Sequence, residues 1–234
     1  MALVKTKRTI VIVGLVGLGA ALTGCGGLGA KERESVSYDV TDKVAALRVE
    51  ADSGTVEVVE SDRQGIHVTE TLVWRKNKPA ASHVVKGDTL TLTFTCPVSV
   101  GINSSCDVSY VVEVPKGLRV DAETDSGRMT LTGLSGEVKA KSDSGAIEAD
   151  RLTAKKVVAE TDSGDTKLVF TTPPDKVETR SDSGSSEVRV PKGPYHVTAE
   201  TDSGDKEIAA IHDDSAARTI EMSSDSGRLE VAAS

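Results

Sequence analysis

Apolar and polar residues alternate along much of this chain, and the alternation stops at short polar turns. A triplet, Asp-Ser-Gly, recurs along the chain. The residues one, three and five positions before its Asp are small or apolar, and they alternate with charged residues. Before Asp202 these residues are Thr201, Ala199 and Val197. A period of two predicts a β-strand with one inward face. Since the apolar residue lies farthest from the turn, we expect the interior to narrow toward the triplet.

The triplet recurs, and a second strand is predicted after each of its last six copies. The sixth residue after the Asp is Leu131, Ala149, Leu168, Val188, Ile208 or Val231. The triplets begin at Asp52, Asp125, Asp143, Asp162, Asp182, Asp202 and Asp225. A self-similar period near twenty residues is typical of stacked repeats. The sequence therefore predicts an all-β, β-solenoid-like stack of strand–turn–strand repeats of about 20 residues.

The residues two positions before the Asp indicate how the repeats stack. Their charges alternate in sign from one repeat to the next: Glu123, Lys141, Glu160, Arg180 and Glu200. If the repeats stack in sequence order and in register, each charge meets its opposite above and below. Such pairs disfavour a slipped register. We therefore predict parallel stacking of successive copies.

The triplet itself suits a tight corner. An Asp side chain can bond its own backbone two residues on, and Gly adopts a positive φ without steric cost. We interpret the row of Asp residues as repeated Asx-turns and assign no metal site. The alternative is a ladder of carboxylates that binds Ca²⁺, although nothing in the sequence matches the Gly-rich nonapeptide of calcium-binding β-rolls.

The N-terminus reads as an export signal with a lipid attachment site. Lys5, Lys7 and Arg8 precede an apolar run that is short for a membrane span, so residues 1–24 are predicted to be a signal peptide. Leu22-Thr23-Gly24-Cys25 resembles a bacterial lipobox, which implies acylation of Cys25, for example with palmitate, after cleavage. The alternative is an ordinary secretory signal followed by an incidental cysteine. Residues 25–35 are expected to be a flexible tether.

Cleavage would also change the charge and with it the expected partners. Losing the three basic residues takes the formal net charge from −8 to −11. An acidic surface disfavours nucleic acid and anionic lipid surfaces as partners. The expected lipid partner is therefore reached through the acylated Cys25, and the expected location is the extracytoplasmic face of the cell membrane.

Residues 36–117 are less regular and are predicted to form a β-rich cap that includes the first repeat, around Asp52. Residues 66–74, 89–95 and 108–114 read as strands of this cap. A cap is needed because an open end of a stack exposes core and an unpaired edge. Residues 118–234 are predicted to form the stacked Asp-Ser-Gly repeats.

Cys96 and Cys106 lie at the two ends of the turn between the last two cap strands. In an exported protein, the two cysteines left after lipidation are expected to pair, and hairpin geometry would bring these strand ends together. We predict a structural disulfide. The alternative of a metal or redox pair is disfavoured by the ten-residue spacing and the lack of a nearby His.

Motifs of catalytic chemistry are missing from the sequence. It contains no Gly-x-Ser-x-Gly elbow, P-loop or His-Glu-x-x-His motif. The four histidines, His67, His83, His196 and His212, are scattered. Acidic and basic residues are spread evenly by the repeat, whereas catalysis needs a local constellation that differs from its neighbours. We therefore predict no catalytic residues and no cofactor.

Two segments resemble a known family. Val111-Val112-Glu113-Val114-Pro115-Lys116-Gly117, and then Asp-Ser-Gly repeats with Leu131-Thr132-Gly133-Leu134-Ser135-Gly136 between two of them, are similar to DUF4097 proteins. That family contains "putative adhesin" β-strand-repeat lipoproteins of actinobacteria and other Gram-positive bacteria, and its actinobacterial members have similar paired cysteines. The resemblance covers residues 40 to 234. It implies a stacked β fold at the cell surface, and the family offers no catalytic residues to transfer.

The leading functional hypothesis is a non-catalytic, lipid-anchored surface module that binds a cell-wall glycan or a surface protein. A carbohydrate-active β-helix enzyme is one alternative, which turnover of polyuronates or peptidoglycan fragments would favour. An accessory protein of envelope-stress signalling is another, which genomic neighbours would favour.

Overall fold

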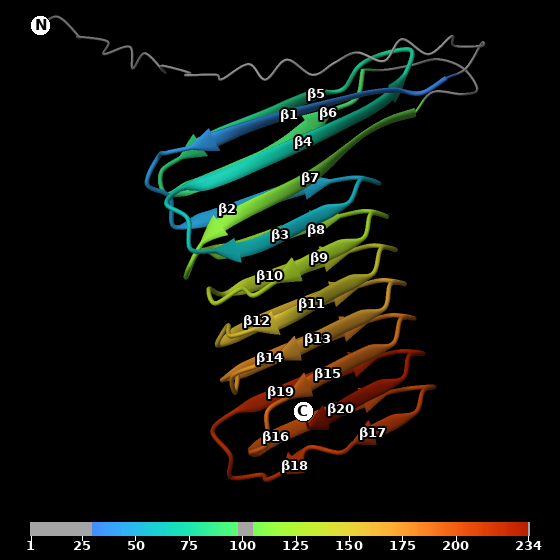
Figure 1. Cartoon of the computed structure of the whole chain (residues 1–234). Coiled ribbons are helices and arrows are strands. Elements are labelled where there is room, and N and C mark those ends of the chain that lie inside the picture. Colours follow the sequence, from blue (N-terminus) through green and yellow to red (C-terminus); the bar gives the residue numbers. More distant parts are fainter. Residues whose placement is uncertain (1–29, 98–104, 234) are drawn as a thin grey trace, which may run out of the picture.

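A computed structural model describes residues 30–97 and 105–233, in which all regular structure is β-strand (Figure 1). No helix in these residues is long and apolar enough to span a membrane. The first seven strands are β1 (Glu32–Val40), β2 (Ala46–Ala51), β3 (Val56–Ser61), β4 (Ile66–Arg75), β5 (Ala80–Lys86), β6 (Thr89–Thr95) and β7 (Ser105–Pro115). The next eight are β8 (Arg119–Thr124), β9 (Met129–Thr132), β10 (Val138–Ser142), β11 (Ile147–Leu152), β12 (Lys156–Thr161), β13 (Thr166–Phe170), β14 (Lys176–Ser181) and β15 (Ser186–Val190). The last five are β16 (Pro194–Thr201), β17 (Lys206–Ile208), β18 (Ile211–His212), β19 (Thr219–Ser224) and β20 (Leu229–Ala233).

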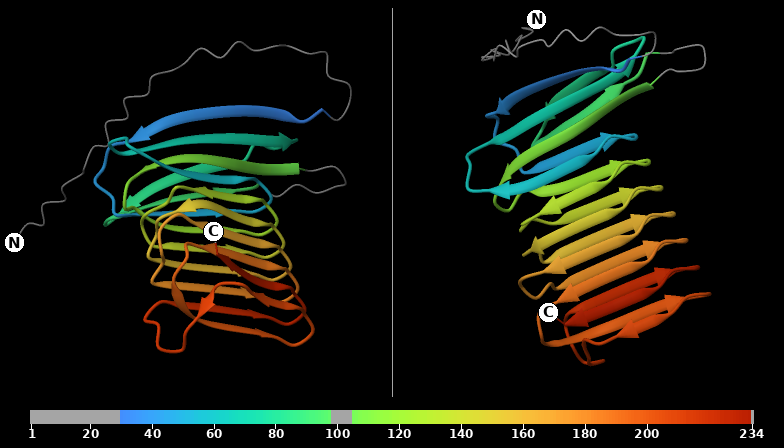
Figure 2. Two further views of the ribbon diagram at one scale, coloured as in Figure 1. Left: turned by 60° about the horizontal axis from the view of Figure 1, so that its bottom comes forward. Right: turned by 45° about the vertical axis from the view of Figure 1, so that its right-hand side comes forward.

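The strands form two sheets, and the two strands of each repeat belong to different sheets. One sheet has the order β1-β4-β7-β3-β9-β11-β13-β15-β20-β17, and the other has the order β18-β16-β19-β14-β12-β10-β8-β2-β6-β5. Neighbouring repeats pair in parallel and in register, as the sequence predicted, so their corners line up along the stack (Figure 2). β6 and β7 belong to different sheets, so the predicted hairpin between them is wrong.

The core lies between the two sheets and narrows toward the corners. In β8, Val120, Ala122 and Thr124 point inward, and each of them is buried. The same order of decreasing apolar size recurs in β10, with Val138, Ala140 and Ser142. Small hydroxyl residues fit near the corner because the two sheets converge there. The alternating pattern thus fixes which face of each strand turns inward.

The last two repeats stack out of sequence order. β19 pairs with both β14 and β16, and β20 pairs with both β15 and β17. The final repeat therefore lies between its two predecessors, and the prediction that successive copies lie directly on one another is wrong at this end. The period alone could not reveal this arrangement, because each repeat offers the same pattern of inward residues to either neighbour.

The other end is closed by the less regular strands, as expected for a cap. β6 and β7 stack in parallel on β2 and β3, and they add a unit that has no Asp-Ser-Gly triplet. β4 then runs antiparallel to β7, β1 antiparallel to β4, and β5 antiparallel to β6. The first repeat, β2 and β3, is thus enclosed between cap strands and β8 and β9.

Candidate interaction surface

At four of the seven triplets, the corner turn is closed by the hydroxyl of the residue before the Asp. The Ser181 hydroxyl accepts a hydrogen bond from the Gly184 N–H at 2.6 Å, and the Ser142 hydroxyl accepts one from the Gly145 N–H at 2.8 Å. Thr124 and Ser224 make the same bond. These hydroxyls are buried, so they satisfy backbone groups that water cannot reach.

The triplet Asp side chains do not close the turn. Within the described residues, no side-chain hydrogen bond is made by Asp52, Asp125, Asp143, Asp162, Asp182, Asp202 or Asp225, so the predicted Asx-turns are wrong. The backbone of each triplet instead forms hydrogen bonds with the triplet of the neighbouring unit. The Ser126 N–H donates to the Asp52 carbonyl at 2.9 Å, and the Ser144 N–H donates to the Asp125 carbonyl at 2.7 Å. The exposed carboxylates therefore form a column along one edge of the stack.

Glycine is required at the third position by close approach. A Cβ atom on Gly164 would lie 2.1 Å from the Gly145 carbonyl oxygen, and one on Gly184 would lie 1.9 Å from the Gly164 carbonyl oxygen. The triplet glycines are not among the residues with positive φ, so the predicted reason for glycine is wrong. Each glycine leaves room for the backbone of the neighbouring unit.

Successive carboxylates repel one another where the column meets the cap. Burial raises the pKa of the Asp52 carboxyl, and the charges of Asp125 and Asp107 raise it further. In the described residues, no group of three or more His, Cys, Asp or Glu side chains is arranged to hold a metal ion.

The outward charges of the first strands are register partners of opposite sign over four repeats, as predicted, and two of the three steps form ion pairs. Lys141 Nζ lies 3.5 Å from Glu123 Oε1, and Arg180 Nη1 lies 3.8 Å from Glu160 Oε1. The Glu123 charge and its hydrogen bond raise the pKa of the Lys141 ammonium. Glu200 does not continue the ladder, because it pairs with Ser223 of the inserted repeat. These contacts are largely exposed, so they favour the correct register more than they add stability.

Two open depressions lie on the flanks of the stack. One has a volume of about 340 Å³ and is lined by Glu148, Ala149, Asp150, Lys167 and Val169. Another, of about 330 Å³, lies at the cap end of the carboxylate column and is lined by Glu50, Ala51, Asp52, Thr93, Phe94, Glu123 and Asp125. The first lies on the neighbouring strands β11 and β13, and the second includes Thr93 and Phe94 of the cap strand β6.

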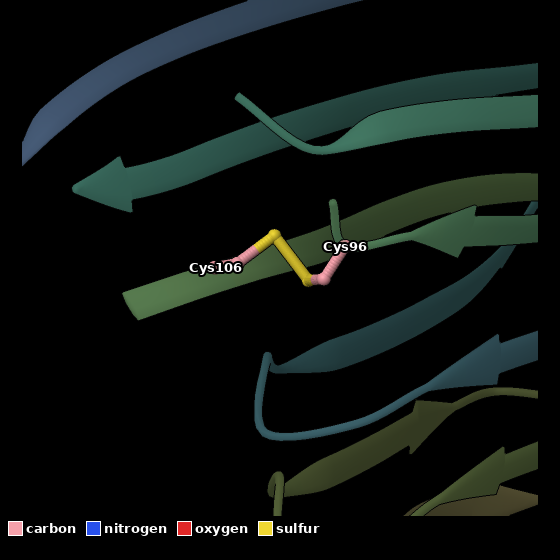
Figure 3. The surroundings of a disulfide bond; sticks show 2 residues. All are labelled: Cys96 and Cys106. Atoms are coloured by element: carbon pink, nitrogen blue, oxygen red, sulfur yellow. A yellow bond between two sulfur atoms is a disulfide. The ribbon is translucent and has the colours of Figure 1, made fainter. Parts of the chain in front are cut away.

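The predicted disulfide is present. Cys96 and Cys106 are bonded, with a Cα–Cα distance of 5.8 Å, where the chain passes from β6 toward β7 (Figure 3). The bond therefore occupies the corner at which other units have the triplet. Cys25, the predicted lipid attachment site, lies outside the described residues.

The two family-like motifs meet at one carboxylate of the first repeat. Glu60 Oε2 accepts hydrogen bonds from the Ser135 N–H at 2.8 Å, the Ser135 hydroxyl at 2.5 Å and the Gly117 N–H at 3.3 Å. Gly117 ends one motif and Ser135 lies in the other. Their role here is to fasten the turns that follow β7 and β9.

A buried polar cluster in the cap was missed from the sequence. Glu70 lies on the inward face of β4 and accepts a hydrogen bond from the Tyr38 hydroxyl at 2.5 Å. Burial, the hydrogen bond and the charge of Glu70 raise the pKa of Tyr38. Burial and then Glu70 also raise the pKa of Tyr110. The signal was present in the alternation, since Glu70 occupies an inward position between Val68 and Leu72.

The histidines are less scattered in space than in the sequence. The rings of His196 and His212 lie 6.0 Å apart at the C-terminal end, and His212 Nε2 lies 3.1 Å from Asp214 Oδ1. The His212 Nδ1 accepts a hydrogen bond from the Val197 N–H at 3.2 Å. His83 stacks on Tyr38 at the opposite end. These contacts close the two ends of the stack.

A family model described as Toastrack DUF4097 matches residues 44–185. No curated protein sequence matches the chain. A solved structure from Clostridium sporogenes, titled a "putative cell adhesion protein", is 14% identical; the alignment covers 87% of this chain and 100% of that one, with a TM-score of 0.47. Another from Bacteroides fragilis, titled a "putative adhesin", is 13% identical; the alignment covers 85% of this chain and 97% of that one, with a TM-score of 0.49.

Proposed function

Because the chain belongs to the Toastrack DUF4097 family, we propose that it is a lipid-anchored extracytoplasmic protein whose β stack is a non-catalytic interaction module. Its partner would be a cell-wall glycan or a surface protein. The observation that carries the proposal is the polar flank, on which charged side chains recur in register from β8 to β14. A surface of this kind suits an extended partner that makes many equivalent weak contacts.

The placement of the ends supports the same proposal. The described chain enters at β1 in the cap, and the triplet repeats extend from the cap toward the opposite end (Figure 1). Parallel neighbours are about 4.8 Å apart, so the eight stacked two-strand units of the described residues span roughly 35 Å. An anchor at Cys25 would hold the cap toward the membrane and the repeats away from it.

The anchor is tested by fractionating cells that express Cys25→Ala. We expect the unaltered chain in the membrane fraction and the variant in the soluble fraction, because the acyl chains supply the membrane affinity. The matched control is Cys96→Ser with Cys106→Ser, which should stay in the membrane fraction. Membrane retention of Cys25→Ala would refute acylation as the anchor.

Binding is tested by sedimenting the purified chain with insoluble cell-wall glycan and, separately, by crosslinking it on intact cells. We expect the chain to be retained or crosslinked, and we expect the variant Lys141→Gln, Glu160→Gln, Arg180→Gln to be retained less, because it removes charges of the flank. A chain that neither sediments nor crosslinks would contradict the proposal. Release of soluble glycan fragments during the incubation would instead indicate an enzyme.

A further inference from the structure

The C-terminal end of the stack has an unusual order. The unit of β16 and β17 (residues 194–208) does not pair with the unit of β14 and β15 (residues 176–190) that precedes it. The unit of β19 and β20 (residues 219–233) lies between them and pairs with both. In one sheet, for example, Ile220 is the register partner of both Val177 and Val197.

The connection into β16 is no longer than one that joins adjacent units. The segment from Val169 to Val177 leads from β13 to the adjacent unit. The segment from Arg189 to Val197 has the same number of residues, starts and ends at equivalent register positions, and yet passes over one unit. The chain could therefore place residues 194–208 directly on residues 176–190 without a longer connection.

The two units also match chemically. Shifted by one unit, Val197 would face Val177, Ile208 would face Val188 and Gly204 would face Gly184, at the offset already seen between β12 and β14. Glu200, which now pairs with Ser223, would face Arg180 and extend the alternating ladder.

The present order also places like charges side by side. Glu221 is the register partner of Glu178, and Glu230 is the register partner of Glu187. If residues 219–233 left the stack, both contacts would be lost, but so would two ion pairs that offset them, Lys176–Glu221 at 3.4 Å and Arg228–Glu207 at 2.5 Å. Glu207 faces a glutamate in either arrangement. The burial of Ile220, Met222, Leu229 and Val231 opposes their departure and favours the observed order.

We infer that this end of the stack has two registers. In the inserted register, residues 219–233 lie between the neighbouring units. In the direct register, residues 194–208 stack on residues 176–190, and residues 219–233 are released as a free unit at the end of the chain. The burial of four apolar side chains and the Lys176–Glu221 and Arg228–Glu207 ion pairs stabilise the first register, and the Arg180–Glu200 pair favours the second. The shift exposes a strand pair without opening the rest of the stack.

The two registers are distinguished by engineered cysteine pairs in the full chain carrying Cys25→Ala. Glu178→Cys with Glu221→Cys joins neighbours only in the inserted register, and Glu178→Cys with Thr198→Cys joins neighbours only in the direct register. Adjacent parallel strands, about 4.8 Å apart, allow a disulfide, whereas strands two positions apart do not. Val158→Cys with Thr198→Cys is the matched control, because these positions are neighbours in neither register.

We expect the first pair to close completely, the second to close slowly and the control to stay open. Adding Ile220→Asp should speed closure of the second pair about tenfold or more, because a buried charge destabilises the inserted unit. Adding Glu200→Arg should slow the second pair and leave the first unchanged, since it places two cations together only in the direct register. Hydrogen exchange in β8 to β13 reports whether the body stays folded. If Ile220→Asp speeds hydrogen exchange in β8 to β13, disulfide formation by the second pair is measured instead in the chain that keeps Ile220. That chain is warmed to just below its unfolding midpoint.

The inference is overturned if the second pair closes no faster than the control while β8 to β13 remain protected from exchange. Insensitivity of the second pair to Glu200→Arg would overturn the role of the Arg180–Glu200 contact.

Discussion

At the scale of single residues, the corner divides its work among neighbouring positions. At four corners the hydroxyl residue before the triplet closes the turn, and the glycine makes room for the adjacent backbone. The Asp side chain does neither, and it stays at the surface as a charge. The positions around the recurring triplet thus differ in their physical roles. The hydroxyl that closes the turn belongs to the residue just before the triplet.

The turn hydroxyl is tested by Ser181→Ala. The substitution leaves the buried Gly184 N–H without its acceptor, so we expect the free energy of unfolding to fall by about 1–3 kcal/mol. The matched control is Ser183→Ala, at the exposed middle position of the same triplet, which should change stability by less than about 0.5 kcal/mol. Urea denaturation measures both; equal losses would contradict the assigned role.

The glycine column is tested by Gly164→Ala. The added methyl would overlap the Gly145 carbonyl oxygen, and relieving such an overlap costs about 1–3 kcal/mol. Gly193→Ala is the control, because a Cβ atom added there would lie 3.8 Å from its nearest neighbour, Arg218 Nη1, and the φ of Gly193 is not in the left-handed region. Thermal unfolding should separate the two variants by several degrees. A Gly164→Ala variant as stable as Gly193→Ala would show that the stack can open at the corner.

At the scale of elements, each unit is held by what its neighbours place opposite it. Inward positions meet similar inward positions. From β8 to β14, the charges two positions before each Asp meet opposite charges, whereas Lys156 meets Lys176. The corners are different, because every unit that has the triplet places a carboxylate in the same column. Stacking therefore brings apolar residues together at the expense of some electrostatic repulsion along the edge.

The repulsion is tested through the pH dependence of Asp52→Asn. The folded-state pKa of Asp52 is raised, so ionisation of Asp52 lowers the free energy of unfolding. This loss is absent below the unfolded pKa of about 3.9 and is complete above the folded pKa. We expect Asp52→Asn to be more stable than the unaltered chain at neutral pH and to lose that advantage on acidification. Stability curves between pH 3 and pH 7, roughly bracketing this range, measure it.

Asp62→Asn is the control of opposite sign. A hydrogen bond from Lys116 and its charge lower the pKa of Asp62, so its contribution is present above the unfolded pKa and is lost as the pH falls through the folded pKa. This variant should therefore be slightly less stable at neutral pH. Identical pH profiles for the two variants would contradict the assigned environments.

At the scale of the whole molecule, the two ends are closed by different devices. The N-terminal end has antiparallel strands, a disulfide and the Tyr38–Glu70 contact. The C-terminal end has a displaced repeat and the short strand β18, which pairs with β16. Both ends place irregular structure where a regular repeat would leave an open face.

The disulfide is tested by Cys96→Ser with Cys106→Ser. Loss of the bond should lower the free energy of unfolding of the cap by about 2–4 kcal/mol, because the denatured chain is no longer constrained. We expect faster hydrogen exchange in β5, β6 and β7 and unchanged exchange in β11 to β13. Uniform acceleration through all the units would show instead that the stack unfolds as one cooperative body.

Much of the architecture was predictable because it is local. The alternation around Val120, Ala122 and Thr124 set a strand and its inward face, and the pairing of Cys96 with Cys106 followed from their position at the ends of a turn. The polar cluster was less visible, since Glu70 looks like any strand residue until Tyr38 is placed beside it. Contacts between distant residues leave no periodic trace in the sequence.

The sequence by itself determined that this protein is a parallel stack of repeats, because a two-residue period and a regular turn repeat the same geometry wherever they occur. Tertiary structure decided which repeat touches which. Since the units share one pattern, their order depends on burial at the chain's end, where Ile220 and Val231 gain cover from units on both sides. It also decided why each corner residue is needed, because the carbonyl that excludes a side chain at Gly164 belongs to another unit.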